Sequence, residues 1–193
     1  KILITYHAAH ETAATAFGVY FKLNSFIFMP IFGLNNAMVP ILSYNYGARK
    51  PERVKKTVKL SIFTAIGIMI LGFAAFELIP DVLLELFDAS ETMLSIGTTA
   101  LRIIGTHFLI AGINVVAMSV YQALGDPLYS LLSAVTRQLV VLLPVAWLLS
   151  RTGQLELVWW AFPIAEVMSF TLSVIFLRRT VKSANAVMTS SAD

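Results

Sequence analysis

The feature that most constrains this chain is a long apolar run that ends in a dense cluster of basic residues. Residues 13–46 contain a single charged side chain, Lys22, whereas residues 47–59 contain six bases and one acid. An apolar segment of this length is sufficient to cross about 30 Å of hydrocarbon, and basic loops are typical of the cytoplasmic side. The pattern therefore predicts a membrane helix whose carboxyl end lies at the cytoplasmic face.

The overall composition agrees with a membrane protein. Only 13% of the residues are charged and the mean hydropathy is +0.78, whereas soluble domains carry about 25% charged residues. Nine of the fourteen bases lie in residues 47–59 and 178–193, while residues 77–91 hold acids and no base. This asymmetry indicates two sides of a bilayer rather than a nucleic-acid surface, so we expect a lipid bilayer and no nucleic acid as a partner.

Apolar segments separated by turn signals predict an all-α fold, a polytopic membrane helix bundle. We expect five full transmembrane helices plus the end of a sixth. They are predicted at about residues 1–10 (partial), 12–45, 57–79, 91–122, 127–149 and 156–178. Residues 1–179 would form a transmembrane domain and residues 180–193 a polar cytoplasmic tail. Because the chain opens inside an apolar segment, we expect it to be part of a longer protein.

Local signals refine this prediction. Gly67 and Gly72 would allow a neighbouring helix to approach closely. Asp88 or Ser90 can cap the helix that follows. The segment Gly125-Asp126-Pro127 predicts the end of one helix, with Asp126 capping the next. The acidic segment 77–92 is expected to lie along the outer interface. The basic loop 47–59 and the basic carboxyl end are separated by four crossings, so both should face the cytoplasm.

Three segments together resemble a known family. They are PILSYNYGARK at residues 40–50, QALGDP at 122–127 followed by Arg137-Gln138, and WWAFPIAE at 159–166. In order and spacing they resemble the bacterial multidrug and toxic compound extrusion (MATE) transporters. The resemblance implies that the five helices are the eighth to the twelfth of twelve, the carboxy-terminal lobe of a two-lobed transporter whose amino-terminal lobe belongs to the same chain.

The resemblance also implies a function. Such transporters are multi-pass proteins of the bacterial cytoplasmic membrane that export small amphipathic, often cationic, compounds. A proton or sodium gradient drives the export, and no cofactor is implied. Some members carry an acidic coupling residue in the seventh or tenth helix. Residues 91–122 hold no acid within their apolar stretch, so the coupling site could lie in the other lobe.

Two ionisable residues fall near the middle of predicted helices. Arg137 and Glu166 each lie about ten residues, or about 15 Å, into a span. The two helices are joined by a short loop and are therefore expected to be antiparallel neighbours. Because ionisable groups at membrane depth are costly unless they are paired or hydrated, we expect Arg137 and Glu166 to meet. The pair could stabilise the lobe or handle the coupling ion and substrate.

Polar residues on two helices are candidates for a substrate cavity. His107, Asn114 and Tyr121 are seven residues apart and would share one helix face. The predicted cavity residues are Asn35, Met38, His107, Asn114, Tyr121 and Gln122. The same polar stripe could instead form hydrogen bonds between helices. Phenylalanines on the helix at 12–45, together with Met29 and Met38, could line an apolar pocket or face lipid and core.

Two other functions are compatible with the sequence. A flippase for lipid-linked precursors would need a strongly basic cavity, which only Lys22, Arg102 and Arg137 could supply. An intramembrane enzyme acting on lipids would need clustered acids or histidines at one depth, and only Glu166 qualifies among the acids. The sequence contains no hydrolase, phosphate-loop or zinc-protease motif. Three scattered histidines and no cysteine argue against a transition-metal site.

Overall fold

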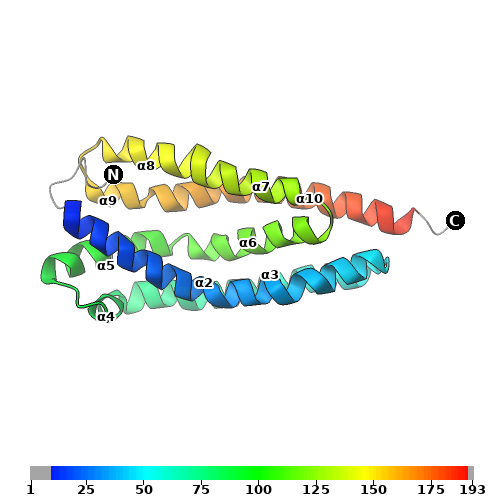
Figure 1. Ribbon diagram of the computed structural model, residues 1–193, viewed down its shortest axis with the longest axis horizontal. Coiled ribbons are helices and arrows are strands. Elements are labelled where there is room, and N and C mark those ends of the chain that lie inside the picture. Colours follow the sequence, from blue (N-terminus) through cyan, green and yellow to red (C-terminus); the bar gives the residue numbers. More distant parts are fainter. Residues whose placement is uncertain (1–9, 191–193) are drawn as a thin grey trace.

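The computed structural model describes residues 10–190, all of which lie in helices or short connections (Figure 1). The long helices run along the long axis of an elongated bundle (Figure 1). Their bounds are α2 (His10–Gly47), α3 (Pro51–Leu78), α4 (Pro80–Glu85), α5 (Glu91–Gly105), α6 (Phe108–Ala123), α7 (Pro127–Val135), a π-helical segment η1 (Thr136–Leu142), α8 (Leu143–Ser150), α9 (Leu155–Trp159) and α10 (Ala161–Thr189). The predicted partial helix at 1–10 lies almost entirely outside the described residues.

The predicted all-helical membrane fold is confirmed. Four helical stretches within residues 10–190 are long and apolar enough to cross a membrane, and the bent pair α5–α6 makes a fifth if it is one span. The first stretch, α2, has 38 residues and continues through Pro30 and Pro40. At 1.5 Å per residue it is about 57 Å long, which exceeds the thickness of the hydrocarbon.

Helix α6 forms the centre of the bundle and packs against α2, α3, α7 and α10. Small residues allow this close packing, which matters because apolar burial alone does not drive helices together in lipid. A Cβ atom at Gly112 would lie 2.7 Å from Met69 and 3.2 Å from the Ala65 carbonyl oxygen. Gly72 is equally crowded, as predicted, but nothing lies within 4 Å of a Cβ at Gly67.

The predicted single helix at 91–122 is broken. Helices α5 and α6 meet at a bend of 52° around Thr106 and His107. The Thr106 hydroxyl donates to the Ile103 carbonyl at 2.7 Å, and the His107 Nδ1 atom contacts the Ile104 carbonyl. These side chains compete with the backbone for helix carbonyls directly after Gly105, a poor helix former.

The predicted helix at 127–149 contains a wide turn. Residues Thr136–Leu142 are π-helical, and Pro144 follows near the start of α8. A proline inside a helix cannot donate to the fourth carbonyl before it, and its ring clashes with that carbonyl. We therefore attribute the wide turn to Pro144. The turn contains Arg137, and π-helical turns are frequent at functional sites.

Several helix ends differ from the prediction. Helix α3 begins at Pro51 rather than residue 57, because proline is well accommodated in the first helical turn. Helix α10 continues to Thr189, so the helix extends through most of the tail predicted at 180–193. Its polar side chains favour solvent but do not prevent helix formation.

The predicted caps have mixed outcomes. Ser90 caps α5 by accepting from the Met93 N–H at 3.3 Å. Asp126 occupies the cap position of α7, but its side chain forms no capping hydrogen bond. Its carboxylate accepts instead from the Thr180 hydroxyl at 2.7 Å, which joins the start of α7 to α10. Gly125 has a φ of +97°, a conformation that glycine adopts without strain.

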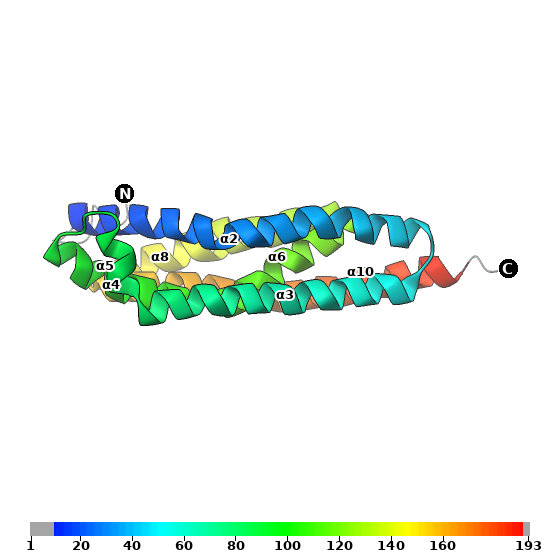
Figure 2. The ribbon, with the colours of Figure 1, turned by 90° about the horizontal axis from the view of Figure 1, so that it is seen from below.

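The two ends of the bundle carry different segments (Figure 2). One end carries the α2–α3 loop, the α6–α7 turn and the carboxyl end of α10. The other end carries α4, the start of α5 and the α8–α9 connection. The basic residues of 47–59 and those after Leu177 therefore lie at the same end, and the acidic segment 77–91 lies at the opposite end.

Candidate functional site

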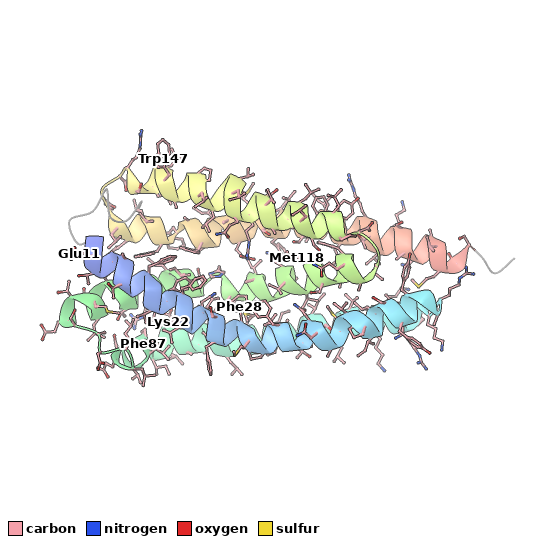
Figure 3. The ribbon with its side chains drawn as sticks, viewed as in Figure 1. Glu11, Lys22, Phe28, Phe87, Met118 and Trp147 are labelled. Atoms are coloured by element: carbon pink, nitrogen blue, oxygen red, sulfur yellow. The ribbon has the colours of Figure 1, made fainter. Side chains whose placement is uncertain are left out.

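A cavity of about 980 Å³ lies among α2, α6, the η1–α8 stretch and the first part of α10. Figure 3 marks two lining residues, Phe28 on α2 and Met118 on α6. Most of the wall is apolar. Its aromatic residues are Phe17, Tyr20, Phe21, Phe28, Phe32, Trp159 and Phe162, and its polar or charged residues include Asn24, Ser25, Asn35, His107, Ser119, Gln122, Arg137, Gln138 and Glu166.

The charged residues of the wall form an ion pair. Arg137 Nη1 donates to Glu166 Oε2 at 3.0 Å, and Asn114 Nδ2 donates to Glu166 Oε1 at 2.6 Å. Both carboxylate oxygens are therefore bonded, as expected for a buried acid. The Glu166 side chain is 4% exposed and that of Arg137 is 35% exposed. A ligand in the cavity would therefore meet the guanidinium first, with the carboxylate behind it.

Two further ionisable groups line the same cavity, Tyr20 of α2 and His107 at the α5–α6 bend. All four residues line the cavity. The cavity thus gathers one acid, one arginine, one histidine and one phenol. Among residues 10–190, no group of three or more acids or histidines could hold a metal ion.

The structure places three of the predicted substrate residues in the cavity wall: Asn35, His107 and Gln122. The Asn35 Oδ1 atom is buried and has no hydrogen-bond partner among the residues the structure describes. It is therefore an acceptor that a ligand could use, since buried polar atoms are otherwise nearly always satisfied.

The other three predicted substrate residues lie elsewhere. Met38 is buried in the core. Asn114 bonds Glu166, and the Tyr121 hydroxyl donates to the Ser173 carbonyl at 2.7 Å. Asn114 and Tyr121 are thus directed at α10. Because the helix is broken at His107, the three residues do not form the single helix face that was predicted. Helices α6 and α10 run parallel, so both contacts join residues that are 52 positions apart.

The apolar candidates are divided between surfaces. Four phenylalanines of α2 line the cavity as one alternative predicted, but Met29 is 67% exposed on the outer surface. Lys22 lies over the Phe87 ring at 5.6 Å (Figure 3). Neither Lys22 nor Arg102 lines the cavity, so the basic cavity expected of a flippase is not formed within residues 10–190.

The prediction did not identify several cavity residues. Tyr20, Met118, Ser119 and Gln138 all line the wall. The sequence could have indicated Gln138 as a cavity residue, because it directly follows Arg137 and lies upstream of Pro144. Ser119 and Met118 gave no signal, because the seven-residue spacing drew attention to a different face of α6.

A multi-span helical bundle around a partly polar cavity is an architecture that membrane transport proteins use, and the comparisons identify the family. The model of the MatE family matches residues 2–148 of the chain. The chain therefore belongs to the MATE family of transporters, and the predicted resemblance is confirmed. Because the family consists of transporters, the alternative of an intramembrane enzyme is excluded.

Individual relatives support this assignment. The chain is 26% identical over 180 residues to the multidrug export protein MepA of Staphylococcus haemolyticus, covering 91% of the chain and 39% of the relative. It is 28% identical to MepA of Staphylococcus aureus over 80% of the chain and 34% of the relative. The chain thus spans about a third to two fifths of the length of these curated relatives.

Solved structures agree on the fold. A complex of the MATE multidrug transporter DinF-BH with rhodamine 6G superposes with a TM-score of 0.78 and 38% identity, covering 84% of the chain and 36% of the transporter. An inward-facing multidrug resistance MATE transporter superposes with a TM-score of 0.87 over the whole chain and 43% of the transporter. At 18% identity the second match supports the fold alone.

Proposed function

We propose that the chain forms the carboxy-terminal lobe of a secondary-active multidrug exporter, which moves amphipathic, often cationic compounds out of the cell. The observation that carries the proposal is the cavity, which combines an aromatic wall with one buried carboxylate. Aromatic rings and Met118 suit varied apolar bodies. The similarity to MepA and DinF-BH supports drug-like substrates. Transport itself needs a second lobe, because alternating access requires two bodies that move relative to one another.

The ion pair gives the cavity an exchangeable counter-ion. A cationic compound, a sodium ion or a proton on Glu166 can take the place of the Arg137 guanidinium. When the compound, the sodium ion or the proton occupies the Glu166 carboxylate, it weakens the binding of the other two. Drug and coupling ion therefore compete for one carboxylate. Competition of this kind is the differential binding that antiport needs. The basic loop 47–59 and the carboxyl end are proposed to lie on the cytoplasmic side.

Binding of rhodamine 6G to the chain in detergent, followed by fluorescence polarisation, tests the cavity. Ala146 lies in the cavity wall on α8, whereas Leu148 is 57% exposed two residues later and does not line it. We expect Ala146→Trp to weaken binding at least tenfold and Leu148→Trp to leave it unchanged. Equal affinity in both variants would show that the dye binds elsewhere.

The counter-ion role is tested with the same probe. Glu166→Gln removes the acceptor of the drug cation, and we expect an affinity loss of about tenfold, equivalent to one charge-assisted contact. Raising sodium or lowering pH should weaken rhodamine 6G binding to the unmodified chain but not to Glu166→Gln. An unchanged ion dependence in the variant would contradict the proposal. In proteoliposomes, gradient-driven export by residues 1–193 alone would contradict the need for a second lobe.

A further inference from the structure

A second, smaller cavity lies at the basic end of the bundle. It has a volume of about 260 Å³ and lies between the first turns of α3 and the last turns of α10. Both helices extend past the end of α6 there, and Leu124, just after α6, forms part of the cavity. Beyond the end of α6, α3 and α10 both continue toward the basic end (Figure 1), and this cavity forms a groove between them.

The groove walls are almost entirely apolar. Val54, Val58 and Ile62 line it on α3, four residues apart and therefore on one helix face. Val181, Ala184 and Met188 line it on α10 with the same kind of spacing. The groove therefore offers an apolar surface to a hydrocarbon chain.

Two lysines border this apolar surface. Lys55 and Lys59 line the groove on α3. Lys55 pairs with the exposed Glu52 at 3.0 Å, and Lys59 lies 5.9 Å from the centre of the Phe63 ring. Within residues 10–190 no carboxylate lies at ion-pair distance from Lys59. The groove thus presents positive charge beside apolar walls.

The position of the lysines along the helix indicates the depth of the groove. Lys59 is the last charged residue before residues 60–76, which contain no charge and span about 26 Å. On α10, Arg178 and Arg179 end the apolar part of the helix in the same way. Lys59 therefore marks the boundary between hydrocarbon and headgroups. Ile62 and Phe63 lie on the hydrocarbon side of Lys59, and Lys55 lies on the headgroup side.

We propose that this groove is a binding site for an anionic phospholipid. The start of one acyl chain lies along Ile62 and Phe63 on the hydrocarbon side, and the phosphate lies between Lys55 and Lys59 at the headgroup level. Basic pockets between transmembrane helices bind anionic lipid headgroups by this combination of charge and apolar surface. A zwitterionic lipid offers the same chain but less net charge. The site therefore selects for headgroup charge, and it is separate from the large cavity and from any transported compound.

Native mass spectrometry of the 193-residue chain tests the proposal. The chain is released from detergent in the presence of equal amounts of dioleoyl phosphatidylglycerol and dioleoyl phosphatidylcholine. We expect phosphatidylglycerol to dominate the first bound lipid. Lys59→Gln should reduce that preference about fivefold, the effect of one lysine at a membrane surface. Lys56→Gln is the matched control, because Lys56 is exposed but does not line the groove.

A second pair of variants tests the apolar part of the site. Val58→Trp fills the groove and should abolish the first bound phosphatidylglycerol, whereas Val187→Trp, at an exposed position of α10 outside the groove, should not. Melting temperatures of the variants show that they remain folded. Equal retention of the two lipids, equal effects of Lys56→Gln and Lys59→Gln, or displacement of the lipid by millimolar glycerol 3-phosphate would each overturn the proposal.

Discussion

Glu166 is the residue on which most of the candidate site depends. Its carboxylate joins three helical stretches, because Asn114 of α6 and Arg137 of η1 both donate to it. Each oxygen has one strong donor, so the charge is stabilised at a depth where an unpaired carboxylate would cost several kcal/mol. The two partners differ in exposure, since Glu166 is buried while Arg137 reaches the cavity. Because of this difference in exposure, substitution of Arg137 and substitution of Glu166 should change the stability of the chain by different amounts.

We expect Arg137→Gln to destabilise the chain more than Glu166→Gln. The first change leaves a buried carboxylate with only Asn114 as donor and should cost about 3 kcal/mol. The second leaves a guanidinium that can reach water in the cavity and should cost about 1 kcal/mol. The double variant should be more stable than Arg137→Gln alone. Denaturation in detergent measures all three, with the exposed Arg179→Gln as control. Additive losses would show that the two residues do not interact.

At the residue scale, the sequence predicted the pair but not its third member. Two opposite charges near the middle of neighbouring spans have few other ways to be satisfied, and this made the contact of Arg137 with Glu166 predictable. Asn114 is a neutral amide and could have faced any neighbour. Only the parallel arrangement of α6 and α10 directs it to Glu166.

At the scale of the helices, the sequence predicted that each helix exists but did not predict where helices are broken. Long uncharged runs require helices in a bilayer, because each backbone group must be satisfied within its own segment. The bend at His107 and the π-helical turn before Pro144 depend on local competition for backbone carbonyls. Hydropathy does not detect such competition, although the proline itself was a usable signal. The two breaks place His107 and Arg137 in the cavity wall.

The close packing of α6 against α3 can be tested by enlarging a glycine at the contact. Gly112→Val would place side-chain atoms where Met69 and the Ala65 carbonyl lie, so we expect a loss of about 1–3 kcal/mol by overpacking. Gly67→Val is the matched control on α3, with nothing within 4 Å of its Cβ, and should change stability by less than about 0.5 kcal/mol. Thermal unfolding in detergent compares them. Equal losses would mean that α6 and α3 are not packed as described.

At the scale of the whole molecule, the bundle has a basic end and an acidic end. The α2–α3 loop and the carboxyl end of α10 lie together, opposite α4 (Figure 1). This arrangement requires an even number of crossings between residues 56 and 183. The bent pair α5–α6 supplies one of these crossings, because α5 begins at the acidic end and α6 ends at the basic end, whereas a re-entrant loop with such a 52° bend would return to the end where it began.

Single cysteines in this cysteine-free chain decide between those arrangements. Lys56, Glu85 and Ser183 are all exposed and lie near the start of α3, at the end of α4 and on α10. In cells treated with a membrane-impermeant maleimide, we expect Glu85→Cys to react from outside, and Lys56→Cys and Ser183→Cys to react only after lysis, because basic segments stay in the cytoplasm. If α5–α6 were re-entrant, the number of crossings would be odd, and Ser183→Cys would react from outside together with Glu85→Cys. That result would contradict both the five-span arrangement and the proposed cytoplasmic carboxyl end.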